Sequence, residues 1–126
     1  MISDLFRAHP EIAARFSQHA PRDLCISSVS VLEIEYGMAK QPQARKKFGE
    51  LWDGLQADLT SLTFDAHDAL HTAQIRAHLA AVGTPIGPYD LLLAGTARAR
   101  ALTLVTHNTS EFARVPGLAY TDWRTD

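Results

Sequence analysis

The sequence has a single cysteine, no long apolar run and no excess of positive charge. Cys25 cannot form a disulfide within one chain, so a reducing cytoplasm is the expected compartment. No apolar stretch approaches the roughly 20 residues of a membrane-spanning helix, and the start lacks the charged and apolar segments of a secretory signal. A net charge of −2 gives no general attraction to nucleic acid. Composition therefore predicts an ordinary globular protein and leaves its function open.

Short apolar segments alternate with helical patterns along the 126 residues. This alternation predicts one α/β domain over residues 1–126, with three α/β/α layers and a central parallel sheet. We expect strands at 24–28, 62–64, 102–106 and 118–120. We expect helices at 2–7 and 11–19, from Ser28 or Ser30 to about residues 37–40, from Pro42 onward, at 67–82, and from Pro88 onward.

Two of these helices have clear sequence signals at their ends. Asp65 is a suitable N-cap for the helix at 67–82, and Gly83 is a typical residue just past a helix end. The helix that begins at Pro42 has apolar residues at helical spacing, which predicts one broad buried face. That face comprises Phe48, Leu51, Trp52, Leu55 and Leu59.

Asp90 is the most conspicuous candidate for a functional residue. It follows the segment 83–89, which contains two glycines and two prolines, and lies in the first turn of a predicted helix. Such a segment restricts the backbone and fixes the position of a side chain that follows it. A purely structural interpretation is also available, because an early acidic residue favours the positive end of a helix dipole. Asp90 alone does not decide between the two interpretations.

Two further segments accompany Asp90 in a characteristic order. Residues 27–37 lie upstream, and residues 102–108 with Glu111 and Phe112 lie downstream. Together with residues 74–76, 115–118 and 122–123, they resemble a VapC-type PIN-domain toxin ribonuclease. Members of that family begin with an apolar strand that ends in Asp-Thr-Asn, and this Asp is a metal ligand. The sequence instead opens on a segment that resembles the following helix, so Asp4 does not match that Asp.

The resemblance therefore leads to an expectation about the start of the chain. We expect Met1 to be an internal residue of a longer natural protein, and the domain to lack its first, central strand. A parallel sheet without a central strand leaves its neighbours without ladder partners. On this hypothesis the chain as printed is poorly stable or self-associates.

Phosphodiester hydrolysis requires an activated water and relief of charge on the phosphoryl oxygens, which Mg²⁺ or Mn²⁺ supplies. These cations prefer carboxylate oxygens. Asp90 is the first expected metal ligand. Glu33 and Glu35 compete for a second position, and since they lie two residues apart on a helix, at most one can face Asp90. Helical periodicity leaves this choice open, whereas the resemblance favours Glu33 and makes Glu35 a surface charge.

Three more residues are candidates through the resemblance. Asn108 stands where many PIN domains have another acid, and its amide oxygen can bind a metal directly or through water. Thr106 is a candidate for hydrogen bonding to a metal-bound water, or it caps the next helix. Arg76 is a candidate for binding a substrate phosphate, or it is an ordinary solvated arginine. Zinc is not expected, because His67 and His71 lack a third ligand.

The resemblance implies the toxin of a toxin–antitoxin pair. Glu33, Asp90 and Asn108 would be its catalytic residues, with Mg²⁺ or Mn²⁺ at Asp90 and Glu33, and RNA, specifically tRNA, as the substrate. A VapB-like antitoxin and a homodimer or higher oligomer are the implied partners. The alternative is a catalytically impaired PIN-fold module, which lacks the first Asp and binds antitoxin or RNA without cleaving. A third interpretation is an unrelated α/β domain in which these acids are helix-end charges.

Overall fold

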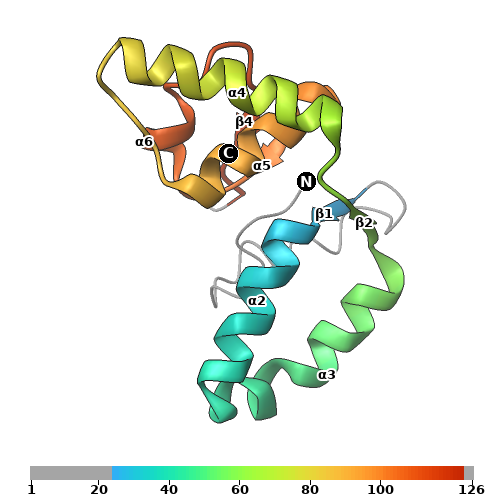
Figure 1. The fold of residues 1–126 in the computed structure, drawn as a ribbon. Helices are drawn as coiled ribbons and strands as arrows, with labels where there is room; N and C mark the ends of the chain where they lie inside the picture. Colours follow the sequence, from blue (N-terminus) through green and yellow to red (C-terminus); the bar gives the residue numbers. More distant parts are fainter. Residues whose placement is uncertain (1–23, 124–126) are drawn as a thin grey trace.

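The computed structural model describes residues 24–123, which form five helices and four strands in an alternating order (Figure 1). The helices predicted at 2–7 and 11–19, and Asp4, lie outside the described residues. Among the described residues, no helix is both long and apolar enough to cross a membrane. The elements are β1 (Cys25–Ser27), α2 (Ser28–Lys40), α3 (Pro42–Asp58), β2 (Thr60–Leu62), α4 (Ala66–Ala81), α5 (Pro88–Ala99), β3 (Leu104–Val105), α6 (Thr109–Phe112) and β4 (Tyr120–Thr121).

The helix ends follow local chemistry. The Asp65 side chain accepts from the backbone N–H of Asp68, and the Asp68 side chain accepts from the N–H of Asp65, so both sides of a capping box are present at the start of α4. Gly83, with a φ of 75°, follows the end of α4 as predicted. The expected cap of α2 was wrong by at least one residue. Ser27 is the N-cap, because its hydroxyl accepts from the N–H of Val29.

The strands are parallel, and β1, β3 and β4 are shorter than predicted. β1 pairs with β2 in the register Cys25 to Thr60, and β3 pairs with β4 in the register Leu104 to Tyr120. β2 begins two residues before the predicted segment, because the ladder with β1 requires residues 60–62 rather than the more apolar 62–64. Within residues 24–123 the strands form two separate pairs. Both pairs are parallel, as the predicted α/β/α architecture requires.

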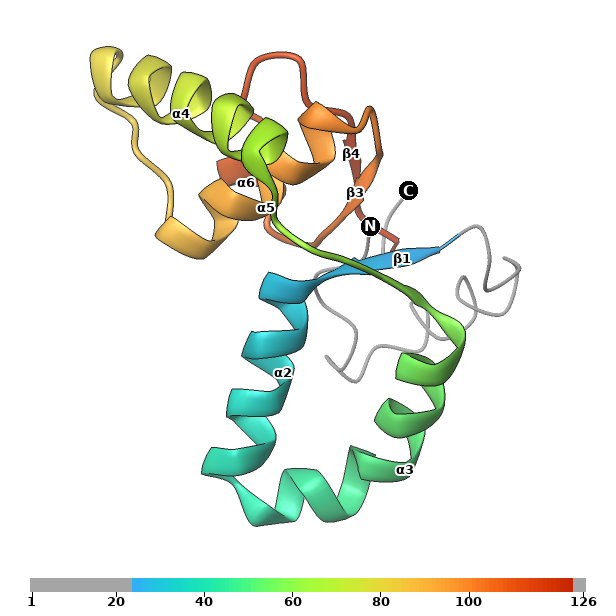
Figure 2. The ribbon, with the colours of Figure 1, turned by 45° about the vertical axis from the view of Figure 1, so that its right-hand side comes forward.

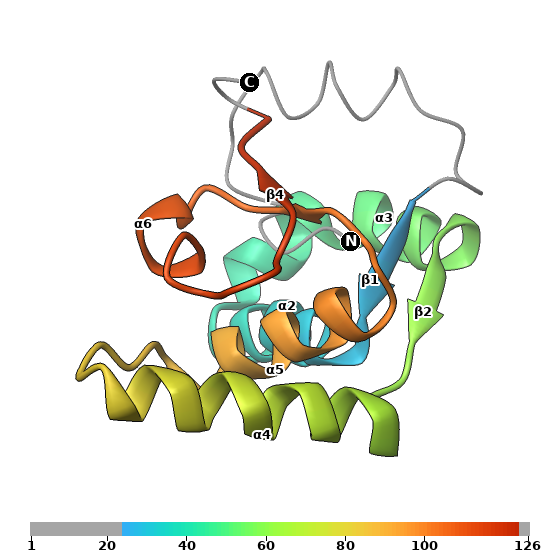
Figure 3. The same cartoon turned by 90° about the horizontal axis from the view of Figure 1, so that it is seen from above.

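The layered arrangement is evident from β3, whose two residues face opposite sides. Leu104 belongs to a buried cluster with residues of α4, α5 and α6, and Val105 belongs to a second cluster with residues of β1, α2 and α3. Successive side chains of a strand point to opposite faces. β3 is thus covered on both faces, as parallel strands in α/β domains are. The view in Figure 3 shows α4 and α5 side by side on one side of this strand pair.

Helices α2 and α3 form a hairpin that extends away from α4 and α5 (Figure 2). Trp52 of α3 is fully buried in the second cluster, and its indole Nε1 donates to Glu35 Oε1 of α2 at 2.8 Å. The predicted apolar face of α3 is correct for Trp52 and Leu59. It is wrong for Leu51, which is 56% exposed because the hairpin presents that side of α3 to solvent.

Helix α5 reaches its position through a close approach to α4. An added Cβ at Gly95 would overlap the Thr72 side chain and lie 3.0 Å from the Thr72 Cα, so only glycine allows this crossing. At the far end of α5, the Arg100 guanidinium pairs with the buried Asp68 carboxylate at 2.9 Å. These contacts fix α5 against α4, and they thereby fix the residue at its first turn, Asp90.

Candidate active site

Asp90 lies in the first turn of α5, as predicted. Gly87 is the N-cap and Pro88 occupies the first helical position. A proline there sacrifices no helical hydrogen bond, because the first N–H groups of a helix lack intrahelical acceptors. The Asp90 side chain is partly buried and is directed toward the segment after β3.

Asn108 joins Asp90 to a second carboxylate. Its side-chain Nδ2 donates to Asp90 Oδ2 at 3.1 Å and to Glu111 Oε2 at 3.0 Å. Asn108 is also the N-cap residue of α6, but its side chain makes no capping bond there. The Asn108 amide therefore bonds to side chains across the site and does not cap α6. The structure brings Asp90 and Asn108 together, and it adds Glu111, which sequence reasoning did not select.

The environment raises the pKa of Asp90 to about 6. Burial of the carboxyl is the largest cause, followed by the closeness of the Glu111 carboxylate. The Asn108 hydrogen bond opposes this rise, and the negative charge of Glu33 adds to it. Carboxylates from α2 and α6 thus act on the Asp90 carboxyl of α5. Such crowding disfavours joint ionisation unless a cation is present.

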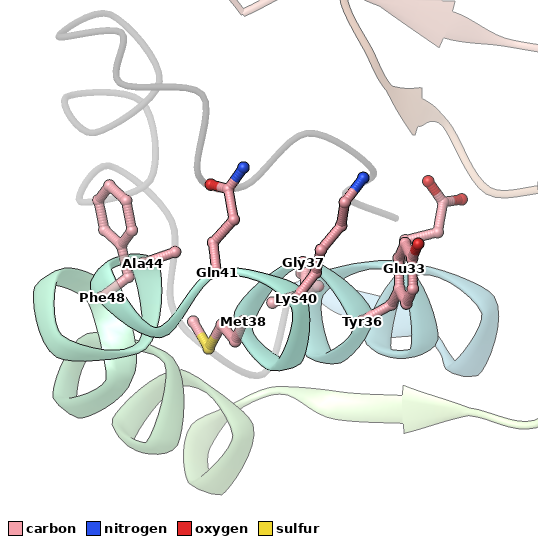
Figure 4. A pocket seen from close by; sticks show the side chains of 9 residues that line it. Glu33, Tyr36, Gly37, Met38, Lys40, Gln41, Ala44 and Phe48 are labelled. Atoms are coloured by element: carbon pink, nitrogen blue, oxygen red, sulfur yellow. The ribbon is translucent and has the colours of Figure 1, made fainter.

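The structure separates Glu33 from Glu35. Glu35 accepts the Trp52 indole hydrogen bond, so it connects α2 to α3 and is more than the surface charge that we expected. Glu33 is exposed on α2, and its charge acts on Asp90. Figure 4 shows its carboxylate directed away from the helix axis, on the same side as Lys40 and Gln41. Of the two glutamates, Glu33 is the one that lies toward Asp90.

Thr106 contacts the backbone of Asn108 in the site. It is buried, and its hydroxyl oxygen accepts from the backbone N–H of Asn108 at 3.0 Å. This short-range bond fixes the backbone of the residue whose side chain connects Asp90 and Glu111. Thr106 thus orients the backbone of Asn108, and its predicted contact with a metal-bound water stays a prediction.

Arg76 lies on the exposed side of α4. It lines a groove of about 910 Å³ between α4 and the start of α5, together with Pro88 and Tyr89. Asp90 follows Tyr89 in the sequence, but neither it nor the other members of the carboxylate cluster line this groove. The groove is lined mainly by apolar side chains, which gives Arg76 an isolated positive charge at its edge.

The donor chemistry of the cluster fits a hard divalent cation. Asp90, Glu111 and Glu33 offer carboxylate oxygens and Asn108 offers an amide, and Mg²⁺ typically takes one or two carboxylates and several waters. Within residues 24–123, no group of three or more histidine, cysteine, aspartate or glutamate side chains is close enough to form a preassembled metal site. Asp90 and Glu111 are therefore the central pair, and Glu33 is a more distant third carboxylate.

Glu111 had a detectable signal in the sequence. It lies three residues after Asn108 at the start of a short helix, which places the two side chains on one face. The segment contributes to the family resemblance, but the resemblance alone gives Glu111 no role. Only the position of α5 shows that this face is turned toward Asp90.

Known proteins resemble this chain over most of its length. The PIN domain family model matches residues 1–118. A tRNA(fMet)-specific endonuclease VapC of Salmonella typhimurium is 42% identical over 112 residues, which cover 89% of this chain and 83% of that protein. A protein of the same name from Shigella flexneri is 45% identical over 100 residues, covering 79% of this chain and 75% of that protein.

A solved structure is similar over nearly the whole chain. The crystal structure of DNA-bound VapBC from Salmonella typhimurium superposes with a TM-score of 0.82 at 40% identity, covering 95% of this chain and 89% of that one. The α/β PIN fold predicted from the sequence is confirmed by this likeness. By sequence and by fold, this chain belongs to the VapC-type ribonucleases of the PIN-domain family.

Proposed function

We propose that this chain is the toxin of a toxin–antitoxin pair, and that it is an endoribonuclease that cleaves tRNA with Mg²⁺ or Mn²⁺ in the cytoplasm. The observation that carries the proposal is the bonding of Asn108 to both Asp90 and Glu111, at 3.1 and 3.0 Å. Two carboxylates held this close are unfavourable without a cation, and their oxygens suit Mg²⁺. The names of the curated relatives support tRNA as the substrate class.

In this mechanism, Asp90, Glu111 and Glu33 would hold the metal. When bound, a divalent cation supplies an activated water and neutralises charge on the phosphoryl oxygens. Asn108 orients the two nearer carboxylates, and Thr106 orients Asn108 through its backbone N–H. Arg76, at the edge of the groove beside Tyr89, would bind a substrate phosphate. Each residue thus has a distinct part in positioning substrate or metal.

An antitoxin partner and an oligomeric assembly belong to the same proposal. Relatives of known structure include VapBC from Salmonella typhimurium and VapBC2 from Rickettsia felis, the latter 28% identical with a TM-score of 0.83. A VapB-like antitoxin that covers the carboxylate cluster would block access to it. A homodimer is the simplest assembly of this chain.

The alternative proposed function is a module that binds antitoxin or RNA without cleaving. The absence of a preassembled three-residue metal site within residues 24–123 is the observation that favours it. The two proposals differ in one measurable property, which is metal-dependent cleavage.

The test is cleavage of an initiator tRNA transcript by the purified chain, with Mn²⁺, with Mg²⁺ and with a chelator. We expect cleavage only with metal, and at least a hundredfold loss in Asp90→Asn, which removes a charged metal ligand. Glu35→Gln is the control. It also replaces a carboxylate with an amide, but at the α2 glutamate that does not lie toward Asp90. If the chain leaves the tRNA intact at every metal concentration yet binds it, the enzyme proposal fails and the binding module stands.

A further inference from the structure

The lysines of this protein are concentrated at one place. All three, Lys40, Lys46 and Lys47, lie where α2 turns into α3. Residues 36–49 contain these lysines and Arg45 and no aspartate or glutamate, although the chain as a whole has a net charge of −2. The tip of the α2–α3 hairpin is therefore strongly basic in a slightly acidic protein. Clustered positive charge of this kind is the electrostatic requirement for binding phosphates.

Aromatic rings lie among these cations. The Lys40 ammonium is 5.9 Å from the centre of the Tyr36 ring, and the Lys47 ammonium is 5.2 Å from the centre of the Phe48 ring. Tyr36 is 62% exposed, which leaves its ring accessible for stacking. Arg45 is engaged differently, because it pairs with Asp53 at 3.3 Å and donates to the Met38 sulfur. Alternating lysines and aromatic rings are typical of surfaces that bind single-stranded nucleic acid.

A groove of about 390 Å³ runs from this tip along α2 to Glu33. Glu33 lines one end of the groove, Tyr36 and Lys40 line its middle, and Phe48 lines the other end. Figure 4 shows Glu33, Lys40, Gln41 and Phe48 directed to the same side. Lys40 follows Glu33 by seven residues, so the two lie two helical turns apart on one face, about 10 Å along the axis.

We infer that this groove binds the RNA strand next to the cleavage site, with a backbone phosphate at Lys40 and a base stacked on Tyr36. The inference rests on the proposed function, because it assigns part of the substrate to a surface that begins at Glu33. The groove has one cation, Lys40, close to one exposed ring, Tyr36, and a single RNA strand offers a phosphate for the first and a base for the second. The basic tip beside the groove, with Arg45, Lys46 and Lys47, favours a polyanion as the occupant.

The test measures the binding of a fluorescein-labelled initiator tRNA transcript by anisotropy, in an Asp90→Asn background so that cleavage does not interfere. We expect Lys40→Gln to weaken binding about fourfold at 0.15 M salt and to reduce the slope of log K against log salt by about 0.7, the value for one lost phosphate contact. The triple change of Lys40, Lys46 and Lys47 to Gln should weaken binding about fiftyfold. Tyr36→Ala should weaken it about tenfold, and Tyr36→Phe should not.

Gln56→Glu is the matched control. It changes the net charge by the same amount as Lys40→Gln, and it lies on the exposed side of the other end of α3. If both variants weaken RNA binding equally, only overall charge matters and the inference fails. It also fails if the Lys40 and Tyr36 variants bind RNA as tightly as the Asp90→Asn parent. Because binding is read without cleavage, failure of the proposed enzymatic activity leaves this result interpretable.

Discussion

The side chain of Asn108 donates to Asp90 Oδ2 at 3.1 Å, although the two residues are 18 positions apart in the sequence. This bond connects the first turn of α5 to the start of α6. Since the same Nδ2 also donates to Glu111, one neutral amide contacts two carboxylates. The repulsion between these carboxylates is only partly offset, and this has measurable consequences for stability and for metal binding.

The contribution of Asp90 to stability should fall as pH rises from about 4 to 6. The pKa of Asp90 is about 6 in the folded protein and 3.8 in the unfolded chain, so its contribution to stability is present at low pH and is lost above pH 6. Asp90→Asn removes this dependence. Because Asp90 is only partly buried, solvent screening limits the effect, and we expect the variant to be more stable by about 1 kcal/mol at pH 7.5.

Thermal unfolding between pH 4 and 8, with and without Mg²⁺, measures this effect. Mg²⁺ should stabilise the original protein above pH 6 and have little effect on Asp90→Asn. A variant that is less stable than the original protein at pH 7.5 would contradict the assigned repulsion.

Glu33 and Glu35 should respond differently to substitution. Glu33→Gln removes a charge that acts on Asp90 and should abolish metal-dependent cleavage with little change in stability. Glu35→Gln retains an oxygen for the Trp52 indole and should be nearly neutral, whereas Glu35→Ala should cost about 1 kcal/mol. The measurements are tRNA cleavage and urea unfolding. Loss of cleavage in Glu35→Gln alone would reverse the assignment of the helix face.

Gly95→Ala should destabilise the protein by about 3 kcal/mol or prevent folding. The new methyl group would overlap Thr72, and the two helices would have to separate. Gly54→Ala in α3 is the matched control, because an added Cβ there has no atom within 4 Å. That control should stabilise the protein by about 0.5 to 1 kcal/mol through helix propensity. Equal destabilisation by both changes in urea unfolding would refute the close crossing.

Arg100→Gln should cost about 3 kcal/mol at pH 7, because it leaves the buried Asp68 carboxylate without its ion pair. Burial by itself raises the pKa of Asp68, but the hydrogen bond and charge of Arg100 reverse this and hold the pKa below its usual value. Stability from this pair is therefore present above pH 4 and is lost as pH falls further. The difference between the original protein and the variant should shrink in urea unfolding at pH 3; a constant difference would exclude the ion pair as its cause.

The sequence pattern correctly predicted much of the fold. The capping residue Asp65, the helix-starting prolines Pro42 and Pro88, and the stop at Gly83 act within a few residues of their own positions. Local chemistry of this kind is readable from sequence, because its partners lie within one or two turns. The exact extent of β2 was not readable, because it depends on the register with β1.

For the site, the sequence by itself determined that Asp90 lies in the first turn of a helix, after a restrained segment, and that the chain resembles a metal-dependent nuclease. It did not determine that Asn108 contacts both Asp90 and Glu111, or that Glu35 is bonded to Trp52. Those contacts depend on how α5 crosses α4 at Gly95 and how α3 packs against α2. They join residues distant in sequence, and only tertiary packing, driven by burial of the two apolar clusters, brings such residues together.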